Sequence, residues 1–264
     1  MIERLLARIG LDRAPAADVD GLHRLHRAYV GRVPYEDLAV QLEETAPLDE
    51  EALMARLLED GRGGYCFELN TVLAALLRAL GFVVTHHEAV VGGEGPVNHM
   101  ALLVHLDGER WLADAGLGEG YLDPLPFREG ATTIGPFTYT LEREAGGSWW
   151  MGAHEWCSFS GFRMTEEALP LSAFDPHHRR MGTDPESSFV QTLVLQQPSV
   201  DRITSLRART FSVIGPSVDM KFVLEREDFA ETLRETFGVT VGGERRERLW
   251  AQAVEQHEEF LARS

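Results

Sequence analysis

The hydrophobic pattern of this 264-residue chain changes its period near residue 82, and this change constrains the fold more than any other feature. Before it, apolar residues recur every three to four positions, which is typical of helices that bury one face. After it come short runs separated by turn residues: FVVTHHEAVV, MALLVHL, RWLADAG, FTYTLERE and WWMGAHEW. Such runs predict antiparallel strands. The order is therefore helices first and then a sheet or barrel.

The first third predicts three helices, over residues 18–30, 49–60 and 66–80. Gly61 and Gly81 stand just past the ends of the second and third. The third pattern is the strongest, because apolar residues occupy one face over four turns: Leu69, Val72, Leu73, Leu76, Leu77 and Leu80.

Residues 189–225 predict further strands, and two helices follow them. We expect the first of these helices to begin at a capping box of Asp228 and Glu231 and to end at Gly238. The chain has no internal repeat, low-complexity tract or extended linker, so its parts should pack together. The predicted fold class is α+β.

Composition disfavours several classes of protein. Hydrophobic residues make up 44% of the chain, but no stretch reaches the roughly 20 apolar residues of a membrane span, and the first ten residues do not resemble a signal peptide. We expect a cytoplasmic protein without membrane partners, with Cys66 and Cys157 reduced. The net charge of -17 disfavours nucleic acid. No HExxH or CxxC pattern predicts a metal site.

Cys66 stands where the glycine-rich turn DGRGG meets the third helix. Free N–H groups and the positive end of the helix dipole favour a thiolate there, although the position is equally typical of a small buried hydrophobe. We expect Glu68 and Asn70, which follow it, to hold the turn by hydrogen bonds without reacting. Cys157 lies in the apolar run AHEWCSF and is expected to be a core or strand residue with no base nearby.

Two later residues can serve as the partners that a nucleophilic thiol needs. His99 begins the apolar strand NHMALLV, and Asp114 ends the next strand at a glycine turn, so a hairpin would bring both side chains to one edge. The imidazole can take the thiol proton, and the carboxylate can hold the imidazole tautomer. Singly, each residue is more often structural. Together and in this order, Cys66, His99 and Asp114 predict a catalytic triad.

Along essentially its whole length the chain resembles the arylamine N-acetyltransferases, through RGGYCFELN, VPYEDL, HMALLV, DAGLG, TDPESSF and ETLRETFGV. The resemblance implies an N-terminal helical bundle over residues 1–83 that carries the nucleophile. It further implies a central antiparallel β-barrel over residues 84–190 that carries the histidine and the aspartate, and a C-terminal α/β lid over residues 191–264. The expected centre is a cysteine-protease-like Cys-His-Asp core.

The resemblance also implies a ping-pong reaction, in which Cys66 takes an acyl group from acetyl-CoA and passes it to an arylamine or related amine. Acetyl-CoA is then a cosubstrate, and no bound cofactor is expected. The backbone N–H of Cys66 is a candidate oxyanion donor. By matching motif positions, four residues are candidates for substrate binding: Tyr35, Gly116, Leu117 and Gly118.

Departures from the family pattern keep a related activity open. Leu117 stands where the family commonly has phenylalanine, and Tyr35 and Asp37 stand where it usually has phenylalanine and asparagine, which suggests a wider or less aromatic site. Amide synthases that close polyketide macrolactams share the triad but use a carrier-bound thioester, so an acyl carrier protein is an alternative partner. Three arginines could meet the phosphates of either donor, although arginines on strands are usually solvated: Arg202, Arg207 and Arg209.

Two functions from other classes of protein also remain possible interpretations of the sequence. A hydrolase or a transglutaminase-like enzyme would use the same triad order and differ in passing the acyl group to water or to a protein amine. A non-enzymatic binding module is disfavoured by an intact triad.

Overall fold

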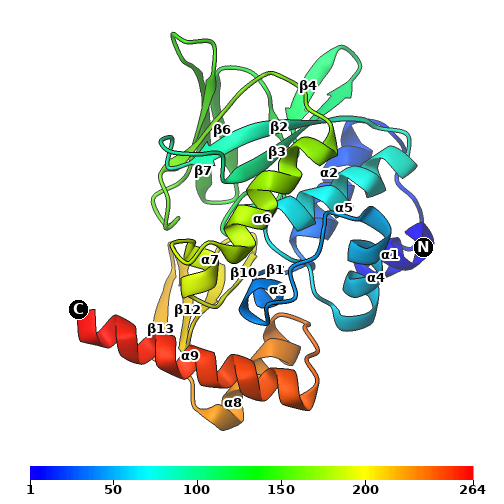
Figure 1. Cartoon of the computed structure of the whole chain (residues 1–264). Coiled ribbons are helices and arrows are strands. Elements are labelled where there is room, and N and C mark those ends of the chain that lie inside the picture. The colour runs from blue at the N-terminus through cyan, green and yellow to red at the C-terminus, as the bar shows by residue number, and fades with distance from the viewer. Residues whose placement is uncertain (264) are drawn as a thin grey trace.

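A computed structural model describes residues 1–263 (Figure 1). The helices are α1 (Ile2–Arg8), α2 (Val19–Val30), α3 (Leu38–Gln41), α4 (Glu50–Asp60), α5 (Cys66–Ala79), the 3₁₀ turn η1 (Leu171–Phe174), α6 (Asp175–Thr183), α7 (Ser188–Gln191), α8 (Arg226–Glu231), the π-helical turn η2 (Thr232–Thr236) and α9 (Gly243–Arg263). The strands are β1 (Tyr35–Glu36), β2 (Val83–Val91), β3 (His99–Leu106), β4 (Glu109–Leu112), β5 (Leu125–Pro126), β6 (Gly130–Ile134), β7 (Phe137–Arg143), β8 (Trp149–Gly152), β9 (Gly161–Met164), β10 (Val194–Pro198), β11 (Ile203–Arg207), β12 (Thr210–Gly215) and β13 (Val218–Val223).

Helix α5 lies at the centre of the first part of the chain and packs against α4, β2 and β3. Every residue from Gly61 to Leu77 is buried, so this helix has no solvent-facing side until its last turn. The three helices predicted from periodicity are confirmed. Asp18 caps α2 and Asp49 caps α4, each accepting a backbone hydrogen bond in the first turn (2.7 and 2.8 Å).

The middle of the chain forms an eight-stranded antiparallel sheet in the order β5-β4-β3-β2-β9-β8-β7-β6. Hairpin β3–β4 pairs Leu103 with Leu112, as the apolar runs predicted. Strand β4 ends at Leu112, earlier than expected, because the Asp114 carboxylate accepts a hydrogen bond from the Gly116 N–H (2.7 Å) and turns the chain. The long sheet, with its own buried core, corresponds to the predicted central β-rich part.

A second, five-stranded antiparallel sheet has the order β1-β10-β11-β12-β13. Its edge strand β1 comes from the first third of the chain, where Tyr35 pairs with Gln196, and the sequence had not indicated this strand. The run RITSLRARTFSVI folds as the two strands β11 and β12. One face of the sheet packs on the C-terminal helices through a shared core that includes Leu206, Phe211 and Leu249.

The expected start of the first C-terminal helix is wrong. Helix α8 begins at Arg226 after Glu225, and the Asp228 N–H is already bonded to the Glu225 carbonyl, so Asp228 lies inside the first turn. The predicted stop is confirmed, because Gly238 follows η2 with a φ of 66°.

Helices followed by antiparallel sheets give the α+β class that the sequence predicted. Of the helices within residues 1–263, none combines the length and the apolarity that a bilayer crossing requires. The division into domains at residues 83 and 190 stays a prediction.

Candidate active site

In the turn before Cys66, the backbone passes very close to neighbouring segments. Gly64 has a φ of 102°, and a side chain at Gly63 would collide with the Pro34 carbonyl oxygen, so both glycines are needed for the backbone. Cys66 is the first residue of α5, where the first N–H groups have no partner within the helix. The sequence thus places the thiol where a helix N-terminus meets a tight turn.

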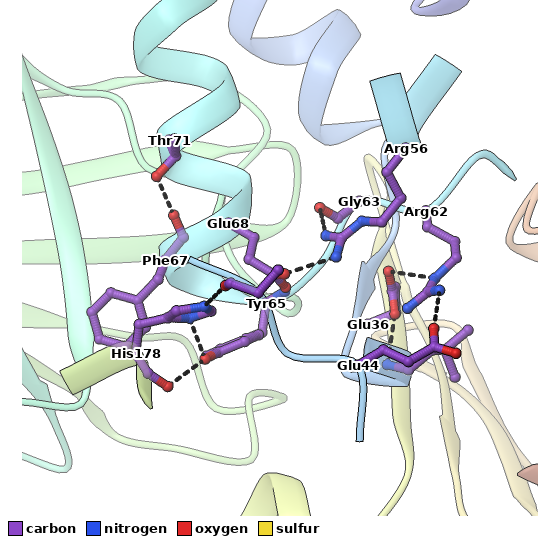
Figure 2. A network of polar contacts seen from close by, with 12 residues as sticks. Glu36, Glu44, Arg56, Arg62, Gly63, Tyr65, Phe67, Glu68, Thr71 and His178 are labelled. Atoms are coloured by element: carbon purple, nitrogen blue, oxygen red, sulfur yellow. Dashed lines mark hydrogen bonds and ion pairs between the residues drawn. The ribbon is translucent and has the colours of Figure 1, made fainter. Parts of the chain in front are cut away.

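Side chains beneath this turn hold it in place (Figure 2). The Glu68 carboxylate accepts a hydrogen bond from the Tyr65 N–H (3.2 Å) and pairs with Arg56 (2.8 Å), which also donates to the Gly63 carbonyl (3.3 Å). The Tyr65 hydroxyl is bonded to His178 Nδ1 (2.6 Å). The expectation that Glu68 holds the turn is confirmed.

His99 and Asp114 meet beside Cys66, as the hairpin predicted. Nε2 of His99 and Oδ2 of Asp114 are 2.6 Å apart, and both side chains are almost fully buried. The other ring nitrogen, Nδ1, is not engaged by Asp114, and the Cys66 side chain is close enough to help raise the pKa of His99. The thiol itself lies 3.5 Å from the Asn98 carbonyl oxygen. The three predicted triad residues therefore lie together at one site, where a hydrogen bond joins His99 to Asp114 and Cys66 lines the same cavity as His99.

Burial and charge act in opposite directions on this pair. Burial alone would lower the pKa of His99, but the charge and hydrogen bond of Asp114, together with the neighbouring Cys66, raise it to about 10. Burial would raise the pKa of Asp114, but His99 and the hydrogen bonds from Asn70 and Gly116 hold it below its ordinary value. The arrangement favours an imidazolium beside a carboxylate.

Asn70 orients the carboxylate, a more specific role than the turn-holding one expected. Its Nδ2 donates to Asp114 Oδ1 (2.7 Å) and to the Met100 carbonyl (2.5 Å), and its Oδ1 accepts from the Ala115 N–H (2.9 Å). One buried side chain on α5 thus fixes both β3 and the turn after β4. Its partners lie 30 to 45 residues away in sequence, so spacing alone could not reveal them.

Cys66 and His99 open onto a cavity of about 860 Å³. Of the four predicted substrate-binding residues, Tyr35, Gly116 and Leu117 line it. Gly118 lines only a smaller neighbouring pocket. Gly116 is required for packing, because a Cβ there would come within 2.7 Å of the Cys66 Cα.

The expectation of a wider or less aromatic site than in the family stays a prediction. Leu117 does line the cavity, but aromatic rings reach it from other segments, including Trp156, Phe159 and Phe189. The opposite wall comes from alternate residues of β10–β12, which are mostly polar, since successive side chains of a strand point to opposite faces.

Of the three candidate arginines, Arg207 lines the cavity. Arg202 is paired with Asp201 at the surface (2.9 Å), and Arg209 lies over the Trp250 ring, 5.1 Å from its centroid. Arg202 therefore fits the alternative given above, an arginine on the solvated face of a strand.

Cys157 differs from its prediction. It lies in the loop between β8 and β9 and lines the same cavity as Cys66. His154 Nε2 is 3.3 Å from its sulfur, so a base is near. Burial, together with the Glu119 charge, raises the pKa of the Cys157 thiol to about 12, and burial lowers the pKa of His154 to about 4. Both groups are therefore neutral near pH 7, which is unlike an activated nucleophile.

Within residues 1–263, no group of three or more His, Cys, Asp and Glu side chains is placed to hold a metal ion.

A family model described as N-acetyltransferase matches residues 18–246. The chain is 31% identical over 229 residues to an arylamine N-acetyltransferase of Mycolicibacterium smegmatis, which covers 79% of this chain and 80% of the relative. It is 41% identical to an arylamine N-acetyltransferase / N-hydroxyarylamine O-acetyltransferase of Salmonella typhimurium, but over 108 residues, 38% of this chain and only 37% of the relative. A proansamycin X synthase of Amycolatopsis mediterranei is 33% identical over 155 residues, 55% of this chain and 60% of that protein.

Solved structures agree over more of the chain. The arylamine N-acetyltransferase from Mycobacterium abscessus superposes with a TM-score of 0.88 at 27% identity, covering 96% of this chain and 95% of that one. The Mycobacterium marinum enzyme in complex with CoA gives a TM-score of 0.87 at 25% identity, covering 96% and 98%.

Proposed function

The chain belongs to the arylamine N-acetyltransferase family, and from this premise we propose that it transfers an acetyl group from acetyl-CoA through Cys66 to an arylamine or a related amine. The observation that carries the proposal is the grouping of Cys66 with the hydrogen-bonded pair of His99 and Asp114 at the wall of a large cavity. Cys66 and His99 are accessible from that cavity, and Asp114 lies behind them.

In the first half-reaction His99 Nδ1 takes the thiol proton, while Nε2–H donates to Asp114. The Cys66 thiolate attacks the thioester carbonyl, the bond to the CoA sulfur breaks, and the CoA thiolate receives the proton from His99. The backbone N–H of Cys66, at the start of α5, is the proposed donor to the oxyanion. The product is an acetyl thioester on Cys66.

In the second half-reaction the amine attacks that thioester. His99 takes the proton from the amine nitrogen, and Cys66 leaves as the thiolate. An amide is more stable than a thioester, so this step runs forward. The raised pKa of His99 supports its role as the base that accepts a proton in each half-reaction.

The cavity supports the binding proposal. Aromatic side chains on one wall suit an aryl ring, and Arg207 with Lys221 adds positive charge that suits the phosphates of CoA. Tyr35, Gly116 and Leu117 are proposed to contact the acyl group or the amine. Gly118 is proposed to act by shaping the turn that carries Leu117.

A second candidate is amide synthesis from a long carrier-bound acyl chain, with an acyl carrier protein as partner. Two observations favour keeping it: the cavity volume of about 860 Å³ greatly exceeds an acetyl group, and one relative is a proansamycin X synthase.

Steady-state kinetics with acetyl-CoA and an arylamine tests the first proposal. We expect an amide product, parallel lines in double-reciprocal plots as for a ping-pong reaction, and no product from Cys66→Ser. Acetylation at the same rate by Cys66→Ser would overturn the proposal. Product from a long-chain acyl thioester, with none from acetyl-CoA, would favour the amide synthase.

A further inference from the structure

The loop of residues 153–160, between β8 and β9, forms one wall of the cavity. Trp156, Cys157, Ser158 and Phe159 line the same space as Cys66. This loop has no strand partners of its own, so its position over the site depends on side-chain contacts.

Glu119 makes polar contacts with this loop, in addition to the ring packing of His154 and Trp156 against Phe137. It follows the turn that carries Asp114, and its side chain is 6% exposed. One carboxylate oxygen accepts from Gln196 Nε2 and from Arg207 Nη2, the latter at 3.3 Å, and the other accepts from the Ser158 N–H at 2.5 Å. A single buried carboxylate thus joins the loop to strands β10 and β11.

Two more hydrogen bonds strengthen the same connection. The Cys157 thiol donates to the Glu119 carbonyl oxygen (3.3 Å), and Arg207 Nη2 donates to the Ser158 hydroxyl (3.2 Å). The Glu119 N–H is bonded to the Leu117 carbonyl (2.7 Å), so the turn itself is closed. The segment 114–119 therefore presents one carboxylate to His99 and another to the loop.

We propose that Glu119 is a positioning residue that ties the loop 153–160 to the second sheet and so sets the binding of the acyl acceptor. This inference rests on the proposed function. The side-chain bonds of Glu119 lead to the loop and to sheet strands, whereas acyl-enzyme formation depends on Cys66, His99 and Asp114. An aryl amine needs the apolar wall that Trp156 and Phe159 supply, so a displaced loop weakens the acceptor step first.

The first test uses Cys157 as a reporter of the loop and does not depend on acetyl transfer. The chain has two cysteines, so Cys66→Ser leaves Cys157 as the single thiol. In that background Glu119→Asp keeps the negative charge that raises the pKa of the Cys157 thiol, but its side chain is one methylene too short to reach all three donors. We expect iodoacetamide to label Cys157 roughly tenfold faster, as expected when a hydrogen bond to a charged group is lost. The matched control, Glu167→Asp, shortens an exposed acidic side chain after β9 and leaves the rate unchanged.

The second test separates the two half-reactions in the chain with Cys66 intact. Glu119→Gln is expected to raise KM for the arylamine roughly tenfold and to change the rate of Cys66 acetylation by less than about twofold.

Unchanged labelling of Cys157 together with an unchanged KM would overturn the inference. An equal loss of both half-reactions with a lowered Tm would also overturn it, because Glu119 would then be merely structural. If the wild-type chain forms no acyl-enzyme, the proposed function fails, while faster labelling of Cys157 in Glu119→Asp, which keeps the charge, would still establish that Glu119 positions the loop.

Discussion

His99 and Asp114 share one buried hydrogen bond. This bond is strong when His99 is protonated, because it then joins a cation to a carboxylate. The folded pKa of His99, about 10, lies above its ordinary value of 6.5. The protonated group therefore stabilises the fold fully below pH 6.5, and this contribution is lost as pH rises through about 10.

We predict that the difference in free energy of unfolding between the wild type and His99→Gln shrinks across that window. Urea unfolding of both chains at several pH values from 6.5 to 10 measures it. A difference that grows with pH would contradict the protonated pair.

Cys66 and Cys157 line one cavity, but their surroundings differ. Cys66 has the helix N-terminus and His99 beside it, whereas burial and Glu119 raise the pKa of Cys157 to about 12. Near neutral pH we expect iodoacetamide to alkylate Cys66 faster than Cys157, by roughly tenfold or more. Peptide mapping of partly alkylated protein measures the ratio. Equal labelling would show that the triad does not activate the thiol.

The roles of single residues could be predicted only where a motif carried them. Cys66, His99 and Asp114 follow from their order and from the glycine turns around them. Asn70 and Cys157 do not, since their contacts join segments that the chain brings together only on folding. An apolar run such as AHEWCSF predicts burial, but it does not reveal that a loop turns Cys157 toward the cavity.

At the scale of elements, the turn of Gly63 and Gly64 decides where α5 begins. A side chain at Gly64 would meet Glu68 and Arg56 and would impose a φ of 102° on a residue that disfavours it. We expect Gly64→Ala to lower the free energy of unfolding by about 1–3 kcal/mol. Activity per folded molecule should fall as well, because the thiol moves with the turn.

Gly146→Ala is the matched control for that change. An added Cβ there meets no atom within 4 Å, so the free energy of unfolding should change by less than about 0.5 kcal/mol. Chemical denaturation of the two variants measures both effects. An equal, small change in both would mean that the turn tolerates a side chain.

Long elements with a clear period were predictable, and short ones were not. Helix α5 has an apolar face over four turns, which no strand could reproduce. Strand β1 has two residues and thus no period, and its partner Gln196 lies far along the chain. The first C-terminal helix was placed too late because Asp228 and Glu231 match a capping box, whereas Glu225 is the N-cap residue.

For the whole molecule, α9 completes the core beneath the second sheet. Leu249 is fully buried there, and Leu261 on the same helix is exposed. We expect Leu249→Ala to lower the free energy of unfolding by about 2–5 kcal/mol, because it leaves a cavity in that core. Leu261→Ala should change it by less than about 0.5 kcal/mol. Urea titrations measure the free energy of unfolding of both variants. A similar loss in each would contradict the assigned packing.

The cavity lies between parts that the sequence presents separately. The thiol comes from the helical part, the histidine from β3, the aspartate from the turn after β4, and the polar wall from the five-stranded sheet. A family resemblance could predict that these parts meet. The wall residues themselves depend on register and loop placement, which the pattern of apolar residues does not determine.

The central claim is that Cys66 carries the acyl group, and intact-mass spectrometry after mixing with acetyl-CoA in the absence of amine tests it most directly. We expect the mass of one acetyl group on the wild-type chain, lost on adding an arylamine, and no adduct on Cys66→Ser. An acetyl adduct that persists on Cys66→Ser, or a wild-type chain that gains no adduct from any acyl thioester, would contradict it.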